Sequence, residues 1–257
     1  MSTASRGVIA PRAVILAAGV GRRLYDTIPE TERRPKSLLA FDGRSLLARH
    51  VAILRAAGVE DITMVIGYCA GQIEAALAAL PGNTPVRTIL NPDYREGSVV
   101  SVWCAREVLL AGGPVLLMDA DVLYDARLMG RLLDSPHADC LLLDRDLEPG
   151  DEPVKLCVAG TRIADFHKRP TAAYDWHGES VGFFRLSAAT AAELADRAGD
   201  YVFSGRRHME YEEPLRDMML AHADRFGFED ITGLPWTEID FPADVEKARA
   251  LLPELAA

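Results

Sequence analysis

The stretch from residue 13 to residue 36 constrains the fold and the function more than any other part of the chain. It reads AVILAAGVGRRLYDTIPETERRPK: a short apolar run, a turn of small residues and then positive charges. Glycines in such a turn let the backbone approach a ligand closely and point N–H groups at an anion. We therefore interpret the turn as a cradle for the phosphates of a nucleotide. The nucleotide-binding residues expected here are Leu16, Ala17, Ala18, Gly19, Gly21 and Arg22.

Two common phosphate-binding motifs are excluded by the letters of this turn. A dinucleotide-binding fingerprint beginning at Gly19 would need another glycine at the position of Leu24. A P-loop would need glycine, lysine and then serine or threonine after four spacer residues, and these are absent as well. A tight turn that binds nothing is the simpler alternative. The paired arginines and the later Pro35 and Lys36 favour phosphate binding, with Lys36 expected to neutralise phosphate charge.

The composition is that of a soluble globular protein with a substantial core. Of the 257 residues, 49% are hydrophobic and 26% are charged, and no apolar run is long enough to span a bilayer. Residues 1–12 lack the apolar centre of a secretory signal, so a flexible terminus and a cytoplasmic location are predicted. The four cysteines are far apart, with no histidine at metal spacing, which indicates neither a zinc site nor a disulfide framework.

Charge is distributed unevenly along the chain. The net charge is −10, yet residues 1–49 contain nine basic and four acidic residues. The overall negative charge argues against nucleic acid as a partner, because binding the phosphate backbone needs a broad basic face. A basic N-terminal part suits a polyphosphate, whereas the acidic remainder suits a divalent metal and a cationic second substrate.

Helices and strands alternate through the first half of the chain. Hydrophobic periodicity and flanking glycines or prolines predict strands at residues 13–16, 61–66, 86–90 and 114–118, and helices at residues 45–58, 71–80 and 98–110. Parallel strands joined by right-handed helical crossovers are the economical arrangement of this pattern. Beyond residue 128 the pattern is mixed, with strands at 140–143, 155–158, 180–186 and 237–240 and helices at 188–198, 214–223 and 242–251.

We expect a Rossmann-like α/β fold with a mixed, mostly parallel central sheet flanked by helices. A single domain over residues 1–257 is predicted, with residues 13–127 as the nucleotide-binding half and residues 128–257 as a smaller α+β acceptor-binding half. The sequence leaves the oligomeric state open, a homodimer included.

Two carboxylates follow the most apolar predicted strand. Asp119 and Asp121 stand at its carboxyl end, which is where open α/β sheets place their chemistry. Carboxylate oxygens suit Mg²⁺, and a bound metal offsets charge at a phosphate under attack. We therefore expect Asp121 to bind Mg²⁺ and Asp119 to lie with the nucleotide. A strand-end aspartate that caps the next helix is the alternative.

Further segments accompany LAAGVGRRL and PKSLL in a fixed order, namely GYCAGQI, NPDYREGSVVSV, LMDADVLYD, ESVGFFRLS, YEEPLRDM and WTEIDFPADVEKA. Only the first segment and DAD are specific by themselves. The ordered set spans nearly the whole chain and resembles the phosphocholine and 2-aminoethylphosphonate cytidylyltransferases of the MobA-like NTP transferase superfamily. One departure is Gly97, where many relatives have asparagine before the serine.

The resemblance implies further site residues. Gln72, Ser98 and Ser101 would line a cytidine pocket, and Asp240 would be the second metal ligand, with Glu238 in reserve. Lys168 is expected at the catalytic centre with Arg22 and Lys36. Lys155, like Lys168, is a candidate for the acceptor's phosphate, although a solvated surface lysine explains it equally well. The remaining acceptor-binding candidates are acidic or aromatic, namely Trp176, Glu179, Tyr211 and Glu212.

The predicted activity is Mg²⁺-dependent transfer of CMP from CTP to a small phosphorylated or phosphonate amine, with release of pyrophosphate. The acceptor oxygen is already ionised at neutral pH, so no general base is needed, in keeping with the lack of a convincing catalytic triad. Two alternatives remain open: a transferase for sugar-1-phosphates or other small phosphorylated metabolites that uses another NTP, and a non-catalytic nucleotide-binding module.

Overall fold

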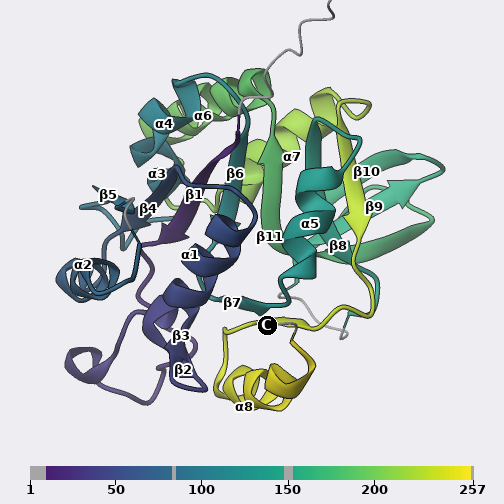
Figure 1. Cartoon of the computed structure of the whole chain (residues 1–257). Helices are drawn as coiled ribbons and strands as arrows, with labels where there is room; N and C mark the ends of the chain where they lie inside the picture. The colour runs from purple at the N-terminus through teal and green to yellow at the C-terminus, as the bar shows by residue number, and fades with distance from the viewer. Residues whose placement is uncertain (1–9, 83–84, 148–152, 256–257) are drawn as a thin grey trace, which may run out of the picture.

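The computed structural model describes residues 10–82, 85–147 and 153–255, and its centre is a nine-stranded sheet (Figure 1). The main path of the sheet runs in the order β10-β9-β11-β6-β1-β4-β5, with β8 alongside β11 and β12 alongside β8. Its strands are β1 (Arg12–Ala17), β4 (Ile62–Ile66), β5 (Arg87–Leu90), β6 (Val115–Asp119), β8 (Asp139–Asp144), β9 (Lys155–Ala159), β10 (Arg162–His167), β11 (Trp176–Leu186) and β12 (Phe226–Asp230).

The first half of the chain forms the parallel part of the sheet, as predicted. Strand β1 pairs in parallel with both β4 and β6, and β4 pairs in parallel with β5. Strand β11 is antiparallel to β6, β8 and β9, so it joins the parallel strands to those of the second half. The mixed, mostly parallel Rossmann-like sheet flanked by helices is therefore confirmed.

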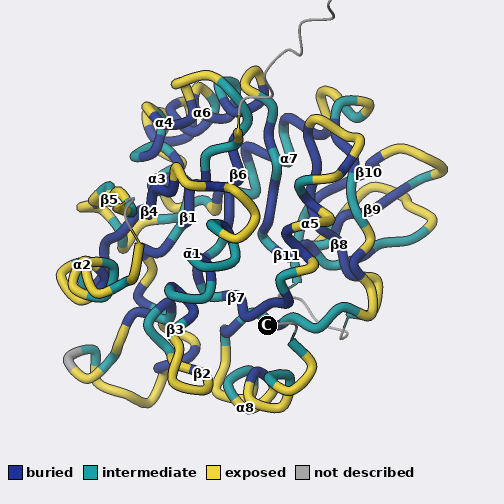
Figure 2. The backbone as a smooth tube through the Cα atoms, viewed as in Figure 1, coloured by how far each residue is buried: buried dark blue, intermediate teal, exposed yellow. Residues whose placement is uncertain are grey.

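Helices cover both faces of this sheet, which explains why its central strands are apolar at most positions. Along β6, Val115 and Leu117 belong to one hydrophobic cluster, and Leu116 and Met118 belong to another. Successive side chains of a strand point to opposite faces, so a strand covered on both faces needs no polar alternation. Figure 2 shows buried strands inside a more exposed layer of helices and loops. These helices are α1 (Leu46–Ala56), α2 (Ala70–Ala78), α3 (Val99–Cys104), α4 (Arg106–Leu110), α5 (Arg127–Asp134), α6 (Ala188–Phe203) and α7 (Glu212–Ala221).

The secondary structure differs from the sequence-based expectation in several details, among them the strand β12, which was not predicted. The helix predicted at residues 98–110 is divided at Ala105 into α3 and α4. A two-stranded sheet is formed by β7 (Val122–Tyr124) and β13 (Trp236–Glu238). The sequence predicted a strand near β13 but none at β7, which only two residues separate from the buried strand β6. After β13 the chain ends in α8 (Pro242–Leu251), and the remaining short elements are β2 (Ala40–Phe41), β3 (Arg44–Ser45) and the 3₁₀ turns Glu30–Glu32, Lys36–Leu38 and Leu252–Glu254. Within the described ranges, no helix is both long enough and apolar enough to cross a bilayer.

Gly182 lies where β11 changes partner, and the structure predicts that it tolerates no side chain. Its φ is +75°, and a Cβ there would lie 2.1 Å from Oδ2 of Asp119. We expect Gly182→Ala to lower the free energy of unfolding by about 2 kcal/mol or more, because backbone strain and a steric clash add. Gly43→Ala is the matched control, since Gly43 has a φ of +71° but no atom within 4 Å of the added Cβ. Urea denaturation of the two variants measures the difference, and equal losses would contradict the clash.

Candidate active site

The small-residue loop after β1 lies at the carboxyl edge of the sheet, beside the end of β6. Leu16 is paired in register with Asp119, and the backbone N–H of Ala120 donates to the carbonyl of Leu16 at 3.2 Å. Gly21 has a φ of +67°, and a Cβ there would lie 3.1 Å from Cγ of Lys36. The glycine therefore allows the loop to turn and the stem of Lys36 to pass close over it.

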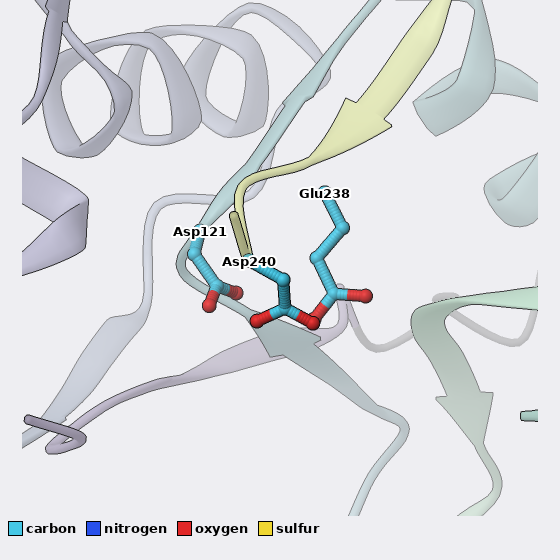
Figure 3. A group of neighbouring side chains, drawn as sticks. All are labelled: Asp121, Glu238 and Asp240. Atoms are coloured by element: carbon cyan, nitrogen blue, oxygen red, sulfur yellow. The ribbon is translucent and has the colours of Figure 1, made fainter. Parts of the chain in front are cut away.

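Three carboxylates that are distant in sequence meet beside this loop. Strand β13 pairs with β7 so that Glu238 lies opposite Val122, and the N–H of Ile239 donates to the carbonyl of Asp121 at 3.0 Å. One carboxylate oxygen each from Asp121, Glu238 and Asp240 lies within 4.8 Å of the other two. Figure 3 shows the three side chains converging on the same space, from the end of β6 and the end of β13.

Lys36 bridges two of these carboxylates. Its Nζ donates to Asp121 Oδ2 at 2.8 Å and to Asp240 Oδ1 at 2.6 Å, and Arg23 contributes a 2.7 Å ion pair to Asp240. Burial lowers the pKa of Lys36, but the charges of Asp121 and Asp240 outweigh it, so the net shift is upward. Lys36 is therefore a permanent cation at the centre of the site.

The site surrounds a cavity of about 460 Å³. Its walls are formed by the small-residue loop after β1, by the carboxylates and by residues of the segments around 94–101 and 208–212. The lining residues are Leu16, Ala18, Gly19, Arg23, Lys36, Tyr94, Arg95, Glu96, Gly97, Ser98, Ser101, Asp119, Asp121, His208, Glu210, Tyr211, Glu212, Glu238 and Asp240.

The charges around this cavity fit a divalent cation. Burial, and then Glu212 and the other nearby carboxylates, raise the pKa of Asp119 well above its ordinary value. Burial, and then the charges of Asp121 and Asp240, do the same to the pKa of Glu238. These shifts arise because several carboxylates share one space and a single buried lysine does not offset them all. Carboxylate oxygens at this spacing are suited to Mg²⁺, which Asp121, Glu238 and Asp240 could hold.

Most of the predicted nucleotide-binding residues lie at this cavity, but not all. Leu16, Ala18, Gly19, Ser98, Ser101 and Asp119 line it, whereas Gly21 lies in the loop and Ala17 ends β1 with its side chain in the core. Gln72 is exposed on α2 and lies outside the cavity walls, because that helix presents Ile73 to the core instead. Arg22 is exposed, and its neighbour Arg23 is the arginine that lines the cavity.

The predicted acceptor residues are divided between two places. Tyr211 and Glu212 line the cavity, where the Tyr211 hydroxyl donates to Asp119 Oδ2 at 2.7 Å. Burial, and then Glu210, raise the pKa of Glu212 to about 8. Lys168 lies at the rim, with its Nζ 3.5 Å from a carboxylate oxygen of Glu210.

A second cavity of about 760 Å³ shares Glu238 and Asp240 with the first. Glu179 lines it, as predicted for an acceptor-binding residue. Lys155 lies beside this region and donates to the carbonyl of Lys168 at 3.0 Å. Trp176 lines neither cavity, because its ring packs against Phe228.

Several lining residues were not anticipated from the sequence. The sequence did not show that Arg23, rather than Arg22, would line the cavity, because both arginines follow the same turn. Trp236 and Phe241 line the second cavity together with acidic residues, and the W-x-E-x-D pattern was the available signal for Trp236. His208 lines the first cavity from a loop that carries no recognisable motif.

Two known proteins are similar to nearly the whole of this chain. Over 249 residues the chain is 28% identical to the CMP-5'-(3-aminopropyl)phosphonate synthase of Streptomyces rubellomurinus, a match covering 92% of this chain and 38% of that protein. It is 29% identical over 249 residues to the bifunctional IPC transferase and DIPP synthase of Rubrobacter xylanophilus, covering 95% of this chain and 52% of that protein. The chain thus spans about half, or less, of the length of these two relatives.

A solved structure and a family match complete the comparison. The structure of the CTP:phosphocholine cytidylyltransferase of Streptococcus pneumoniae has a TM-score of 0.74 at 22% identity, covering 95% of this chain and 100% of that one. Residues 13–169 match the family described as the MobA-like NTP transferase domain. Because this match includes more than half of the chain, together with the phosphate loop, Asp119 and Asp121, the protein belongs to the MobA-like NTP transferase family.

Proposed function

We propose that the protein is a cytidylyltransferase that moves CMP from CTP to a phosphate or phosphonate oxygen of a small amine-bearing acceptor. Mg²⁺ is the proposed cofactor, and 2-aminoethylphosphonate and phosphocholine are the proposed acceptors. The observation that carries the proposal is the meeting of the small-residue loop, Lys36 and three carboxylates around one cavity. The similarity to a protein named as a CMP-phosphonate synthase supports CTP and a phosphonate amine.

The reaction is an in-line displacement at the α-phosphorus of the nucleotide. A bond forms between the acceptor oxygen and the α-phosphorus, and the bond from that phosphorus to the leaving pyrophosphate breaks. The attacking oxygen is ionised and has no proton to lose, so the side chains contribute position and charge. Lys36 and Arg23 line the cavity as cations that stabilise the growing negative charge, and Lys168 does the same from the rim. Mg²⁺ held by Asp121 and Asp240 would supply additional charge neutralisation at the phosphates.

The second cavity supports a cationic acceptor. Its walls carry Asp144, Glu179 and other acidic side chains, together with the aromatic rings of Trp236 and Phe241. Carboxylates attract an ammonium group, and aromatic faces bind it when it is quaternary. Because this cavity shares Glu238 and Asp240 with the first, an acceptor held there would bring its phosphate or phosphonate to the metal ligands.

A screen of pyrophosphate release tests the proposal directly. CTP, GTP, UTP and dTTP are each incubated with Mg²⁺ and with phosphocholine, 2-aminoethylphosphonate, phosphoethanolamine or a sugar-1-phosphate. We expect release with CTP and at least one of the three amines, and none after removal of metal by a chelator. Silence with every amine would refute the acceptor class. Turnover with a sugar-1-phosphate and another NTP would favour the alternative transferase, and nucleotide binding without any turnover would favour a binding module.

A further inference from the structure

We propose that Asn91 is a positioning residue that favours CTP over UTP, because it keeps the proton of the Ser101 hydroxyl available for donation to the base. The inference rests on the proposed function, since it concerns the nucleotide of that same site. Asn91 lies below the cavity wall rather than on it, and only 1% of it is exposed. It therefore acts through Ser101, which lines the cavity.

The orientation of the Asn91 amide is determined by the backbone. Its Oδ1 accepts a hydrogen bond from the N–H of Asp93 at 2.9 Å, and an N–H group can only donate. The Nδ2 group must then be the atom that faces Ser101, and it donates to Ser101 Oγ at 3.0 Å. The backbone N–H of Asn91 donates to the carbonyl of Ile66 at 2.7 Å, which holds the residue at the end of β5.

This contact keeps the proton of the Ser101 hydroxyl available to the cavity. Asn91 uses one of the two lone pairs of the Ser101 oxygen, so the proton and one lone pair remain for a ligand. Ser98 has the same arrangement, because its Oγ accepts from the N–H of Tyr211 at 2.8 Å. Both serines line the cavity, and Ser101 is 6% exposed. The oxygen of each serine thus already accepts one hydrogen bond. The proton of each hydroxyl remains available to a ligand that binds between the two serines.

The order of the strands places these serines at the base end of the site. Asp119 and Asp121 follow β6, the small-residue loop follows β1, and Asn91 follows β5 on the far side of β4. A nucleotide with its phosphates at the loop and the metal ligands can extend toward β5, which lies beyond β4 in the sheet (Figure 1). Asn91 directly follows β5, and its Nδ2 contacts Ser101 of α3.

The polarity matters because cytosine and uracil differ at N3. That atom is a hydrogen-bond acceptor in cytosine and carries a proton in uracil, whereas O2 is an acceptor in both. Cytosine N3 therefore needs a hydrogen-bond donor, which Ser101 supplies while its proton is available, whereas the N3–H of uracil needs an acceptor. A site built on such hydrogen bonds rejects a ligand that leaves its polar groups unsatisfied.

The sharpest test is Asn91→Asp, which reverses the polarity with almost no change of shape. The carboxylate still accepts from the N–H of Asp93, but its other oxygen can only accept, so Ser101 would turn its proton toward it. The Ser101 lone pairs would then face the base and accept from uracil N3–H. We expect the ratio of kcat/KM for CTP to kcat/KM for UTP to fall at least roughly tenfold, with KM for the acceptor unchanged.

Two further variants keep the inference testable. Ser101→Ala should lower the same ratio, and Asn91→Asp should have no further effect on it in that background, because the serine transmits the effect. Calorimetric titration of CTP and UTP into each variant gives the same ratio from affinities, and it does so even if no acceptor is turned over. A wild-type protein that binds neither nucleotide would overturn the proposed function. CTP turnover with an unchanged ratio in Asn91→Asp or Ser101→Ala would overturn this inference alone.

Discussion

Replacement of Asp240 by asparagine is expected to lower kcat by about a thousandfold. Asp240 is one of three carboxylates that share one space, and it also holds Lys36 at 2.6 Å. Burial raises the pKa of Asp240, but Lys36 and Arg23 outweigh it, so the net shift is downward and the group is an anion at neutral pH. An amide would supply one neutral oxygen in place of a charged one, and a metal at such a site contributes several kcal/mol.

Two measurements on Asp240→Asn separate metal binding from catalysis. Binding of Mn²⁺, followed by electron paramagnetic resonance, should weaken together with turnover. Asp61→Asn is the matched control, because it removes the same charge from an ion pair with Arg87 at the opposite end of the parallel strands. Unchanged Mn²⁺ affinity in Asp240→Asn would contradict its role as a ligand and would shift that role to Glu238.

Lys36→Met is expected to lower kcat by about a hundredfold to a thousandfold, with a smaller change in KM for the nucleotide. The Lys36 ammonium lies at the cavity that the phosphates would occupy, and its side chain is only 13% exposed. Charge on the phosphates grows in the transition state, so a buried cation there stabilises the transition state more than the bound substrate. Steady-state kinetics with CTP and the best acceptor measure both constants.

A charge-matched control accompanies Lys36→Met. Arg87→Met also removes one positive charge, but from the exposed pair with Asp61, and should leave kcat within twofold of wild type. A rise in KM with unchanged kcat in Lys36→Met would mean that the lysine binds substrate and transition state equally. That result would contradict a catalytic role for Lys36 and leave it as a binding residue.

The parallel core and the position of the small-residue loop after β1 could be predicted from the sequence because their signals are local. Strands β1, β4 and β6 are continuous apolar runs, and such runs follow from burial on both faces. Asp121 follows one of these strands directly, so its place at the sheet edge could be derived. Asp240 was identified only through resemblance, since nothing in its own segment says that β13 pairs with β7.

The remaining site residues depend on contacts between distant segments. Arg23 rather than Arg22 lines the cavity because it reaches Asp240, a contact across more than two hundred residues. Trp176 was chosen for its ring, but the ring packs against Phe228 of a strand that the sequence did not predict. Composition shows which residue types are available, whereas the topology of the sheet decides which of them face the substrate.

The pairing of β13 with β7 also has a consequence for synthesis on the ribosome. The loop after β1, Lys36 and Asp121 all belong to the first half of the chain, and they emerge from the exit tunnel early. Asp240 follows β13, so the two proposed metal ligands coexist only after the segment between residues 121 and 240 has been synthesised. Under the proposed function, a nascent chain would therefore carry the loop after β1 before it could turn over CTP.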